Sequence, residues 1–468
     1  MKNSLHTSII ACCLFVITTI GITTSADEQN IFKTNRGTHA LNTQPVFPLA
    51  QKTIQKVEGK VRFYNLVDNK FAGNHLVDAD KAKKEWMVKH YDRMQVYSPY
   101  FDEHTEWYKN GMVYKDMYAI YNCEEFDCSP QWIPITQFIF DEHPEWILRD
   151  SDGNPLYLPF GCKNGSCPQF AADISNSEFR QFWIDDLRER LDAAFNMTGK
   201  GYHGIFVDDD VNVDLVRSVV TDAGLSGNPI NPATGLLIED EEWQDTVAEF
   251  VELIRSEFLG KEIVHNSVWF HAQPGNPYLD RQIDAADTIS LERGINDPSM
   301  HSGSGEFGIQ SFLAVSDYIH NRGRNTVHFV SVNDLPCPTL PCFAPSPLQT
   351  ALIQIEYSLA GWLLASGGHD WFGSRELNTP DNWWHGYDTN LGKALGERYE
   401  DPVNGLLRRD FVNGIVLLNG PGAAPVFVNL PETFYTLDGN PVDQVTLVSR
   451  VGKILLRNPP EINAFVTP

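Results

Sequence analysis

Short apolar segments alternate with longer amphipathic stretches along most of this chain, and this order restricts its possible folds more than any other feature. Eight segments are predicted to be strands because they are short, apolar and bounded by polar or turn-forming residues. They cover residues 61–67, 93–100, 117–122, 203–209, 262–270, 287–294, 325–334 and 369–373. Apolar residues at three- and four-residue spacing predict helices between them, over residues 177–195, 241–260, 306–323 and 347–368.

Alternating helices and buried strands indicate a parallel sheet that is covered by helices. Eight strands within about 310 residues fit a (β/α)8 barrel better than an open doubly wound sheet. No Gly-x-Gly-x-x-Gly follows the first strand, and the chain has no phosphate-binding P-loop motif, no Gly-x-Ser-x-Gly and no His-Glu-x-x-His. The sequence therefore predicts an α/β protein with a barrel over residues 59–400, and we expect neither a cofactor nor a resident metal.

The last part of the chain has a different pattern. Segments 414–420, 424–430, 433–442 and 444–457 are short alternating strands, broken by Asn-Gly, Asp-Gly and Pro-Gly pairs that favour turns. They predict a small antiparallel β domain over residues 405–468.

The amino terminus carries one lysine, an apolar stretch from about Ile9 to Ile22, and small residues ending at Ala26. This is the pattern of a secretory signal peptide over residues 1–26. The apolar run is short for a membrane span. Residues 27–58 show little periodicity and are expected to form an exposed lead-in. We therefore expect a secreted or periplasmic protein without a stable membrane span.

The cysteine pattern agrees with export. Beyond the signal peptide, the cysteines form three Cys-x4-Cys pairs, which are Cys123 with Cys128, Cys162 with Cys167, and Cys337 with Cys342. In an oxidising compartment these pairs predict three local disulfides. A zinc site built from the thiolates is the alternative, although the spacing is wider than most zinc motifs use.

The chain is strongly acidic, with a formal net charge of −25. This charge argues against nucleic acid or an anionic membrane as a partner. Aromatic residues make up 12% of the chain, and their faces suit either sugar rings or the protein core. The sequence makes no prediction about oligomeric state.

Acidic residues stand where several predicted strands end. Asp208, Asp209 and Asp210 follow the fourth strand, Glu292 ends the sixth, and Asp334 ends the seventh. Reactive side chains of a (β/α)8 barrel lie at the carboxyl ends of its strands. Asp208 and Glu292 are therefore expected to face the same centre. Two carboxylates in such a place are the groups that glycoside hydrolysis uses, so Asp208, Glu292 and Asp334 are the candidate catalytic residues.

Structural interpretations of these acids stay open. The run of three aspartates could be a solvated loop or a calcium site, although Val213 and Val219 stand where an EF-hand loop needs Gly and Glu. Glu292 could instead form an ion pair with Arg293.

Other polar and aromatic residues near strand ends could bind sugar hydroxyls or stack on sugar rings. These candidate substrate-binding residues are Asn65, Tyr97, Tyr121, Asp209, Asp210, His265, Asn266, Trp269, Asn333 and Trp371.

The segments "GIFVDDD", "ISLERG" and the carboxyl-terminal "YTLDGNPVDQVTLVSRVGKILLR" together resemble hypothetical bacterial glycoside hydrolases with a TIM barrel, over residues 60–460. More distantly, the chain is similar to the α-galactosidase and α-amylase clans. This resemblance implies that Asp208 is the nucleophile after strand four. It also implies that Glu292 is the acid/base after strand six, where α-galactosidase-like enzymes have Asp. An amylase-type acid after strand five is missing, because that strand carries His265, Asn266 and Trp269.

The sequence thus predicts an exported glycoside hydrolase that cleaves a poly- or oligosaccharide with a carboxylate pair. One alternative is a carbohydrate-binding protein that keeps the barrel without catalysis. The other is a metal-dependent hydrolase that uses the acids with His265 or His369 as ligands.

Overall fold

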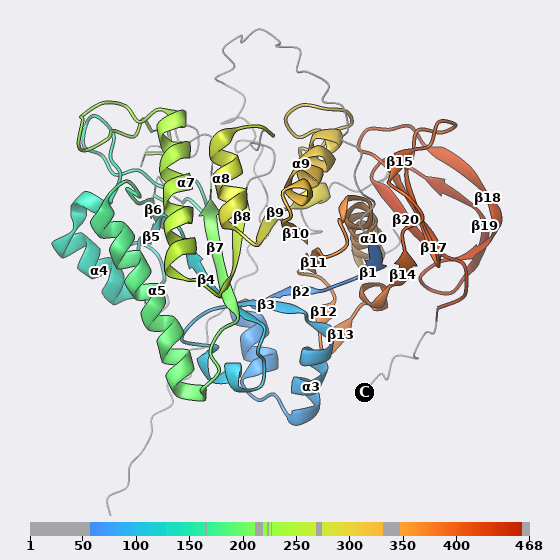
Figure 1. Cartoon of the computed structure of the whole chain (residues 1–468), viewed down its shortest axis with the longest axis horizontal. Coiled ribbons are helices and arrows are strands. Elements are labelled where there is room, and N and C mark those ends of the chain that lie inside the picture. The colour runs from blue at the N-terminus through green and yellow to red at the C-terminus, as the bar shows by residue number, and fades with distance from the viewer. Residues whose placement is uncertain are drawn as a thin grey trace, which may run out of the picture. The chain divides into compact units, whose positions relative to one another are not determined.

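The computed structural model of the chain describes residues 57–460, apart from residues 129, 131, 164–165, 211–218, 222–223, 226, 268–273 and 331–346. Eight parallel strands form its central sheet (Figure 1). In spatial order they are β2 (Tyr64–Leu66), β3 (Arg93–Val96), β4 (Gly111–Asp116), β7 (Gly204–Asp210), β8 (Glu262–Ser267), β9 (Thr288–Glu292), β10 (Asn325–Val330) and β11 (Trp371–Ser374). The edges meet at a parallel bridge between Phe63 and Phe372, which closes the sheet into the predicted (β/α)8 barrel.

Helices lie between successive barrel strands in the chain. They are α2 (Asn69–Phe71), α3 (Lys81–His90), α4 (Trp132–Glu142), α5 (Ser177–Thr198), α7 (Asp240–Glu257), α8 (Pro277–Ala285), α9 (Ile309–Asn321) and α10 (Pro347–Ala365). Local signals fix their ends. The Asn176 side chain accepts hydrogen bonds from the first turn of α5, and Gly199 ends this helix with a φ of 73°. The described chain also contains short single-turn helices, which are η1 (Ala72–Leu76), η2 (Asp102–Glu106), η3 (Pro144–Trp146), η5 (Gly294–Asn296) and η6 (His385–Asp388).

The third barrel strand differs from the prediction. Residues 117–122 were expected to form it, but β4 at Gly111–Asp116 occupies that position, so this prediction is wrong. Residues 119–121 instead form β5 (Ala119–Tyr121), which pairs antiparallel with β6 (Gln169–Ala171) outside the barrel. The strand β4 was not recognised in the sequence because it contains a charged residue, Lys115. Lys115 is buried, and its charge is balanced by an ion pair with Asp186 on α5.

The barrel interior has its own apolar core. Its members are Tyr64, Met112, Phe206, Val264, Val327, Phe329 and Trp371. Two glycines make room for it. A Cβ at Gly204 would lie 2.2 Å from the Glu262 carbonyl oxygen, and one at Gly373 would lie 2.4 Å from the Phe329 ring. Side chains alternate along each strand, so these residues identify the positions of each strand that face inward.

The carboxyl-terminal part forms an antiparallel sheet of six strands, as predicted for its class. In spatial order these are β15 (Tyr399–Glu400), β16 (Leu407–Phe411), β17 (Gly414–Asn419), β20 (Val451–Leu456), β18 (Val426–Tyr435) and β19 (Pro441–Leu447). Short strands precede it, with β1 (Glu58–Lys60) on β14 (Asn390–Lys393) and β12 (Asn378–Thr379) on β13 (Asn382–Trp383).

The sheet is anchored on α10. The buried Arg409 guanidinium donates to the carbonyls at the end of this helix, the shortest bond being 2.8 Å to Ser366. Glu356 accepts from the Ile454 backbone at 3.2 Å and pairs with Lys453. Such contacts fix the sheet to the last helix of the barrel.

Two of the three predicted disulfides are formed, Cys123–Cys128 and Cys162–Cys167. Cys337 and Cys342 lie outside the described residues, as do the predicted signal peptide and nearly all of the lead-in. Within the described part of the chain, no helix combines the length and apolar character that a membrane span requires.

Candidate active site

Asp208 and Glu292 lie close together at the carboxyl ends of β7 and β9, on either side of Asn266 from β8. The Asn266 side chain faces inward, two residues beyond the interior Val264. Its Nδ2 donates to Asp208 Oδ1 at 2.6 Å and to Glu292 Oε2 at 3.1 Å. The distance between two oxygens that accept from the same nitrogen cannot exceed the sum of the two hydrogen-bond lengths. The carboxylates are therefore within about 6 Å of each other, which is a distance that carboxylate catalysis uses.

A second set of donors reaches Asp208 from β4. The Tyr114 hydroxyl lies 2.6 Å from Asp208 Oδ2 and 2.6 Å from Asp116 Oδ1. The Tyr121 hydroxyl lies 2.6 Å from the other Asp116 oxygen. Each hydroxyl has one hydrogen, so Tyr114 can donate fully to only one of these two carboxylates at a time. Tyr114 and Asn266 together contact both oxygens of Asp208.

Contacts with neighbouring residues restrict the position of the segment that carries Tyr121. Its ring stacks on Trp132 of α4 at a centroid distance of 4.8 Å, and its carbonyl accepts from Thr136 at 2.9 Å. The Cys123–Cys128 disulfide begins two residues later. A small closed loop adds little global stability, but it restricts the local chain. The disulfide therefore helps to fix the position from which Tyr121 reaches Asp116.

Glu292 lies in an environment that favours its protonated form. Its side chain is accessible to solvent, but it lies among protein groups that displace much of the surrounding water. This desolvation and, second, the Asp208 carboxylate raise the pKa of Glu292 above its ordinary value of 4.5. The Asn266 hydrogen bond and the charges of Arg293 and Arg375 act in the opposite direction without cancelling the rise.

Tyr97 joins this group. It follows β3 on the inward side, and its ring lies 4.9 Å from that of Tyr114. Burial, and then the charges of Asp116 and Asp208, raise the pKa of its hydroxyl. Of the predicted substrate-binding residues, the structure thus gathers Tyr97, Tyr121 and Asn266 around Asp208.

Three other predicted residues are not brought to the carboxylates. Asn65 is buried on the outward side of β2 and accepts from Asn378 at 2.8 Å. His265 is buried between the inward residues Val264 and Asn266, so it faces the surrounding helices. Trp371 begins β11 at the opposite end of the barrel, where its indole nitrogen donates to Asp92 at 3.3 Å.

The remaining predicted residues have no described side chain. The backbones of Asp209 and Asp210 end β7, while Trp269, Asn333 and Asp334 lie wholly outside the described residues.

Sequence reasoning missed Tyr114, Asp116 and Arg375. The first two lie on β4, whose segment "GMVYKD" ends with an acid after apolar residues, as β7 does. That shared pattern could have identified them. Arg375 directly follows β11 and influences both Glu292 and Tyr97 electrostatically.

Among the described residues, neither histidine that was predicted as a metal ligand lies beside the strand-end carboxylates. His265 faces outward, and His369 precedes β11 at the other end of the barrel. Among the described residues, the group with suitable spacing for a metal is His143, Glu145 and Glu178, on η3 and α5. None of its members belongs to the Asp208 site.

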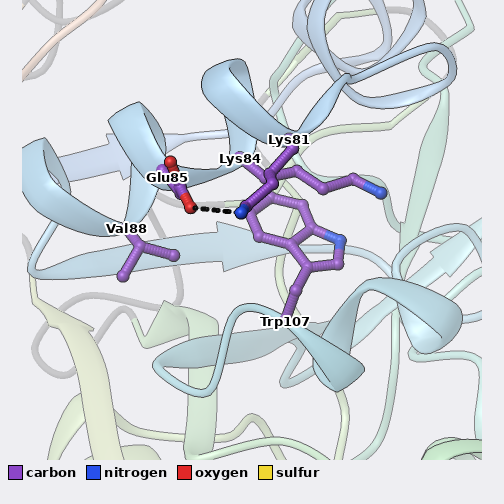
Figure 2. Close-up of a pocket in the computed structure, with 5 residues that line it drawn as sticks. All are labelled: Lys81, Lys84, Glu85, Val88 and Trp107. Atoms are coloured by element: carbon purple, nitrogen blue, oxygen red, sulfur yellow. Dashed lines mark ion pairs between the residues drawn. The ribbon is translucent and has the colours of Figure 1, made fainter.

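A surface pocket lies elsewhere, against α3 (Figure 2). It has a volume of about 400 Å³ and is lined by Lys81, Lys84, Glu85, Val88 and Trp107. Lys84 Nζ lies 5.7 Å from the centroid of the Trp107 ring. None of the strand-end residues lines this pocket, so we do not identify it with the candidate active site.

The chain was compared with known protein families, curated proteins and solved structures. The model of a family described as hypothetical glycosyl hydrolase family 15 matches residues 108–415. A search of curated proteins finds no match.

Solved structures that resemble the chain include three glycoside hydrolases. One is the glycoside hydrolase domain of a PelA variant from Pseudomonas aeruginosa, at 12% identity over 69% of this chain and 97% of that one, with a TM-score of 0.37. Another is a maltogenic α-amylase from Thermotoga neapolitana, at 11% identity over 85% and 98%, with a TM-score of 0.40. The third is trehalose-6-phosphate hydrolase from Bacillus licheniformis, at 10% identity over 85% and 100%, with a TM-score of 0.40. Likeness at this level carries no information on substrate.

Proposed function

The chain belongs to the hypothetical glycosyl hydrolase family 15, and we propose that it is an exported, retaining glycoside hydrolase with Asp208 and Glu292 as its catalytic pair. The observation that carries the proposal is the shared donor Asn266, which bonds to both carboxylates. The two oxygens that it bonds are at most about 6 Å apart, which is below the roughly 6.5–9.5 Å of inverting enzymes and compatible with the roughly 5–5.5 Å of retaining ones.

The environments of Asp208 and Glu292 differ, and this difference suggests a separate role for each. Asp208 accepts hydrogen bonds from Tyr114 and Asn266, which stabilise a carboxylate and aim it. Glu292 has a raised pKa and is therefore the better proton donor. Asp208 is accordingly the nucleophile, and Glu292 is the acid/base.

The reaction then has two steps. In the first, Glu292 gives its proton to the glycosidic oxygen while Asp208 attacks the anomeric carbon, so the bond to the leaving sugar breaks and a glycosyl ester forms on Asp208. In the second, the Glu292 carboxylate takes a proton from water, the resulting hydroxyl attacks the anomeric carbon, and the ester bond to Asp208 breaks. The product has the configuration of the substrate.

Export is supported by two kinds of observation. The formed disulfides Cys123–Cys128 and Cys162–Cys167 are typical of an oxidising compartment. The first 26 residues have the pattern of a secretory signal peptide.

The test is release of reducing ends from a broad panel of polysaccharides by the wild type and by Asp208→Asn. Asp185→Asn is the matched control, because Asp185 lies exposed on α5. We expect release by the wild type and the control, with a loss of at least about 10³-fold in Asp208→Asn. Proton NMR of the first product should show a retained anomer.

Three results would contradict the proposal in distinct ways. Full activity of Asp208→Asn removes this residue from the reaction, and an inverted product removes its role as nucleophile. Binding of a glycan without release by the wild type would favour the carbohydrate-binding alternative.

A further inference from the structure

Two arginines beside the candidate active site lack the partners that the other arginines have. Among the arginines that the structure describes, only Arg293 and Arg375 neither donate a hydrogen bond nor form an ion pair. The chain has 61 Asp and Glu against 36 Lys and Arg, so acidic partners are abundant. Two unpaired guanidinium groups in such a chain call for an explanation at their own positions.

Both positions directly follow barrel strands on the carboxylate side. Arg293 comes after Glu292 at the end of β9, and Arg375 comes after Ser374 at the end of β11. Trp371 and Gly373 face the barrel interior, and Arg375 is two residues further along the chain. Both charges are close enough to Glu292 to oppose the rise in its pKa. The two arginines therefore flank the general acid from different strands.

The backbone at Arg293 adds a further sign of constraint. Its φ of 60° lies in the left-handed region, which is unfavourable for a residue that carries a Cβ. Glycine would relieve this strain, yet the position carries a long cationic side chain that is exposed. Backbone strain of this kind occurs often at binding sites, so it agrees with a role of Arg293 in binding.

We propose that Arg293 and Arg375 bind an anionic substituent, a carboxylate or a sulfate ester, on a sugar next to the scissile bond. The substrate is then an acidic polysaccharide, an inference that rests on the proposed function. A guanidinium group suits this role because its planar donors match the oxygens of both anions.

The net charge of the protein does not oppose this local recognition. At physiological ionic strength, salt screens charges beyond about 8 Å, so the nearby arginines outweigh the distant acids. Glu292 is also uncharged whenever it is ready to donate its proton. The protonated Glu292 then does not repel an anionic substituent that lies beside it.

The experiment compares charged glycans with matched neutral ones. Polygalacturonate is paired with its methyl ester to test a carboxylate, and carrageenan with agarose to test a sulfate. Binding is measured by affinity electrophoresis of the full-length protein in an Asp208→Asn background, so that no glycan is consumed. The variants are Arg293→Gln, Arg375→Gln and both together. Arg188→Gln is the control, because it removes a paired arginine on α5.

We expect each site variant to weaken binding of one charged glycan about tenfold or more, with no change for its neutral partner or in the control. The charged glycan that responds identifies the anion. Binding that the variants leave unchanged, equal losses on the neutral partner, or a protein that binds no charged glycan would each overturn the inference.

The same panel separates this inference from the proposed function. Arginine-dependent binding of a charged glycan that the wild type never hydrolyses supports the anion site and contradicts the hydrolase. Hydrolysis confined to neutral glycans supports the hydrolase and contradicts the anion site.

Discussion

The two ends of the barrel interior use the same kinds of residue in opposite ways. At the amino-terminal end, Arg93 on β3 reaches past β4 and β7 to Glu262 on β8, at 2.6 Å, and both side chains are 13% exposed. His203 adds a contact of 3.0 Å to the same carboxylate. The guanidinium of Arg93 also lies 5.2 Å from the centroid of Trp371. Charges at this end are thus satisfied within the protein.

At the carboxyl-terminal end, the charged groups are arranged differently. Asp208 and Glu292 repel each other across a shared donor, and Arg293 and Arg375 have no ion-pair partner among the described residues. The two ends of the barrel therefore differ in how their charges are balanced. Paired charges at the start of the strands stabilise the closed sheet, while Arg293 and Arg375 at the strand ends are the groups that we propose for binding an anion.

The same substitution at both ends of the barrel should have opposite effects. Glu292→Gln should lower kcat/KM by about 10²–10⁴-fold, because the proton donor is lost, with little change in thermal stability. Initial rates and thermal unfolding of the purified variant measure the two effects. A variant that unfolds early and keeps its rate would reverse the assignment of this end.

Glu262→Gln is the matched change at the other end. It leaves Arg93 buried without its carboxylate, and we expect a loss of about 3 kcal/mol in the free energy of unfolding. Activity per folded molecule should remain. Urea unfolding and rates at low temperature measure these quantities.

The stability difference should also depend on pH. Burial alone would raise the pKa of Glu262, but the hydrogen bonds from His203 and Arg93 outweigh it and hold the pKa below 4.5. The contribution is therefore complete above pH 4.5 and is lost as the pH falls through the lower folded-state value. A difference between wild type and Glu262→Gln that grows in acid would contradict this account.

A smaller effect is expected at the edge of the catalytic group. Tyr114→Phe removes the hydrogen bond to Asp208 but keeps the ring, so we expect kcat to fall about tenfold. Tyr399→Phe is the control, because it removes a similar bond to Asp410 on the carboxyl-terminal sheet. Equal rates for the two variants would show that Tyr114 does not position the nucleophile.

The smallest expected change is a displacement of the pH profile. The alkaline limb of kcat should follow the pKa of Glu292, since only its protonated form donates. Arg375 favours the charged form of Glu292, so Arg375→Gln should move this limb to higher pH. A shift toward lower pH would contradict the electrostatic role of Arg375.

The sequence predicted the barrel because strand and helix periodicities are local properties, and the predicted segments overlap every barrel strand except the third. That strand was hidden by Lys115, whose partner Asp186 is 71 residues away and cannot be recognised from local pattern. The same error concealed Tyr114 and Asp116. In the terminal sheet, segments 424–430 and 433–442 were separated, whereas β18 runs through Pro431 with a shift in register.

The candidate site was predictable to the extent that strand ends reveal it. Asp208 and Glu292 stand at such ends, and their roles remain predictions. Asn65 and His265 could have been set aside from strand alternation alone, because each lies between two inward positions. The shared bond of Asn266 and the lack of partners for Arg293 and Arg375 depend on three-dimensional distances. No pattern in the sequence contains that information.

The bridge between Phe63 and Phe372 has a consequence for biosynthesis. The first barrel strand has no partner on its outer edge until the last strand, about 310 residues later, has left the ribosome. At usual rates of synthesis this interval is on the order of 15 to 60 s. The unpaired backbone groups of an open strand edge can form hydrogen bonds with a strand of another chain. Closure of the barrel therefore protects that edge only after synthesis of β11, and the nascent chain is most exposed to mispairing before this point.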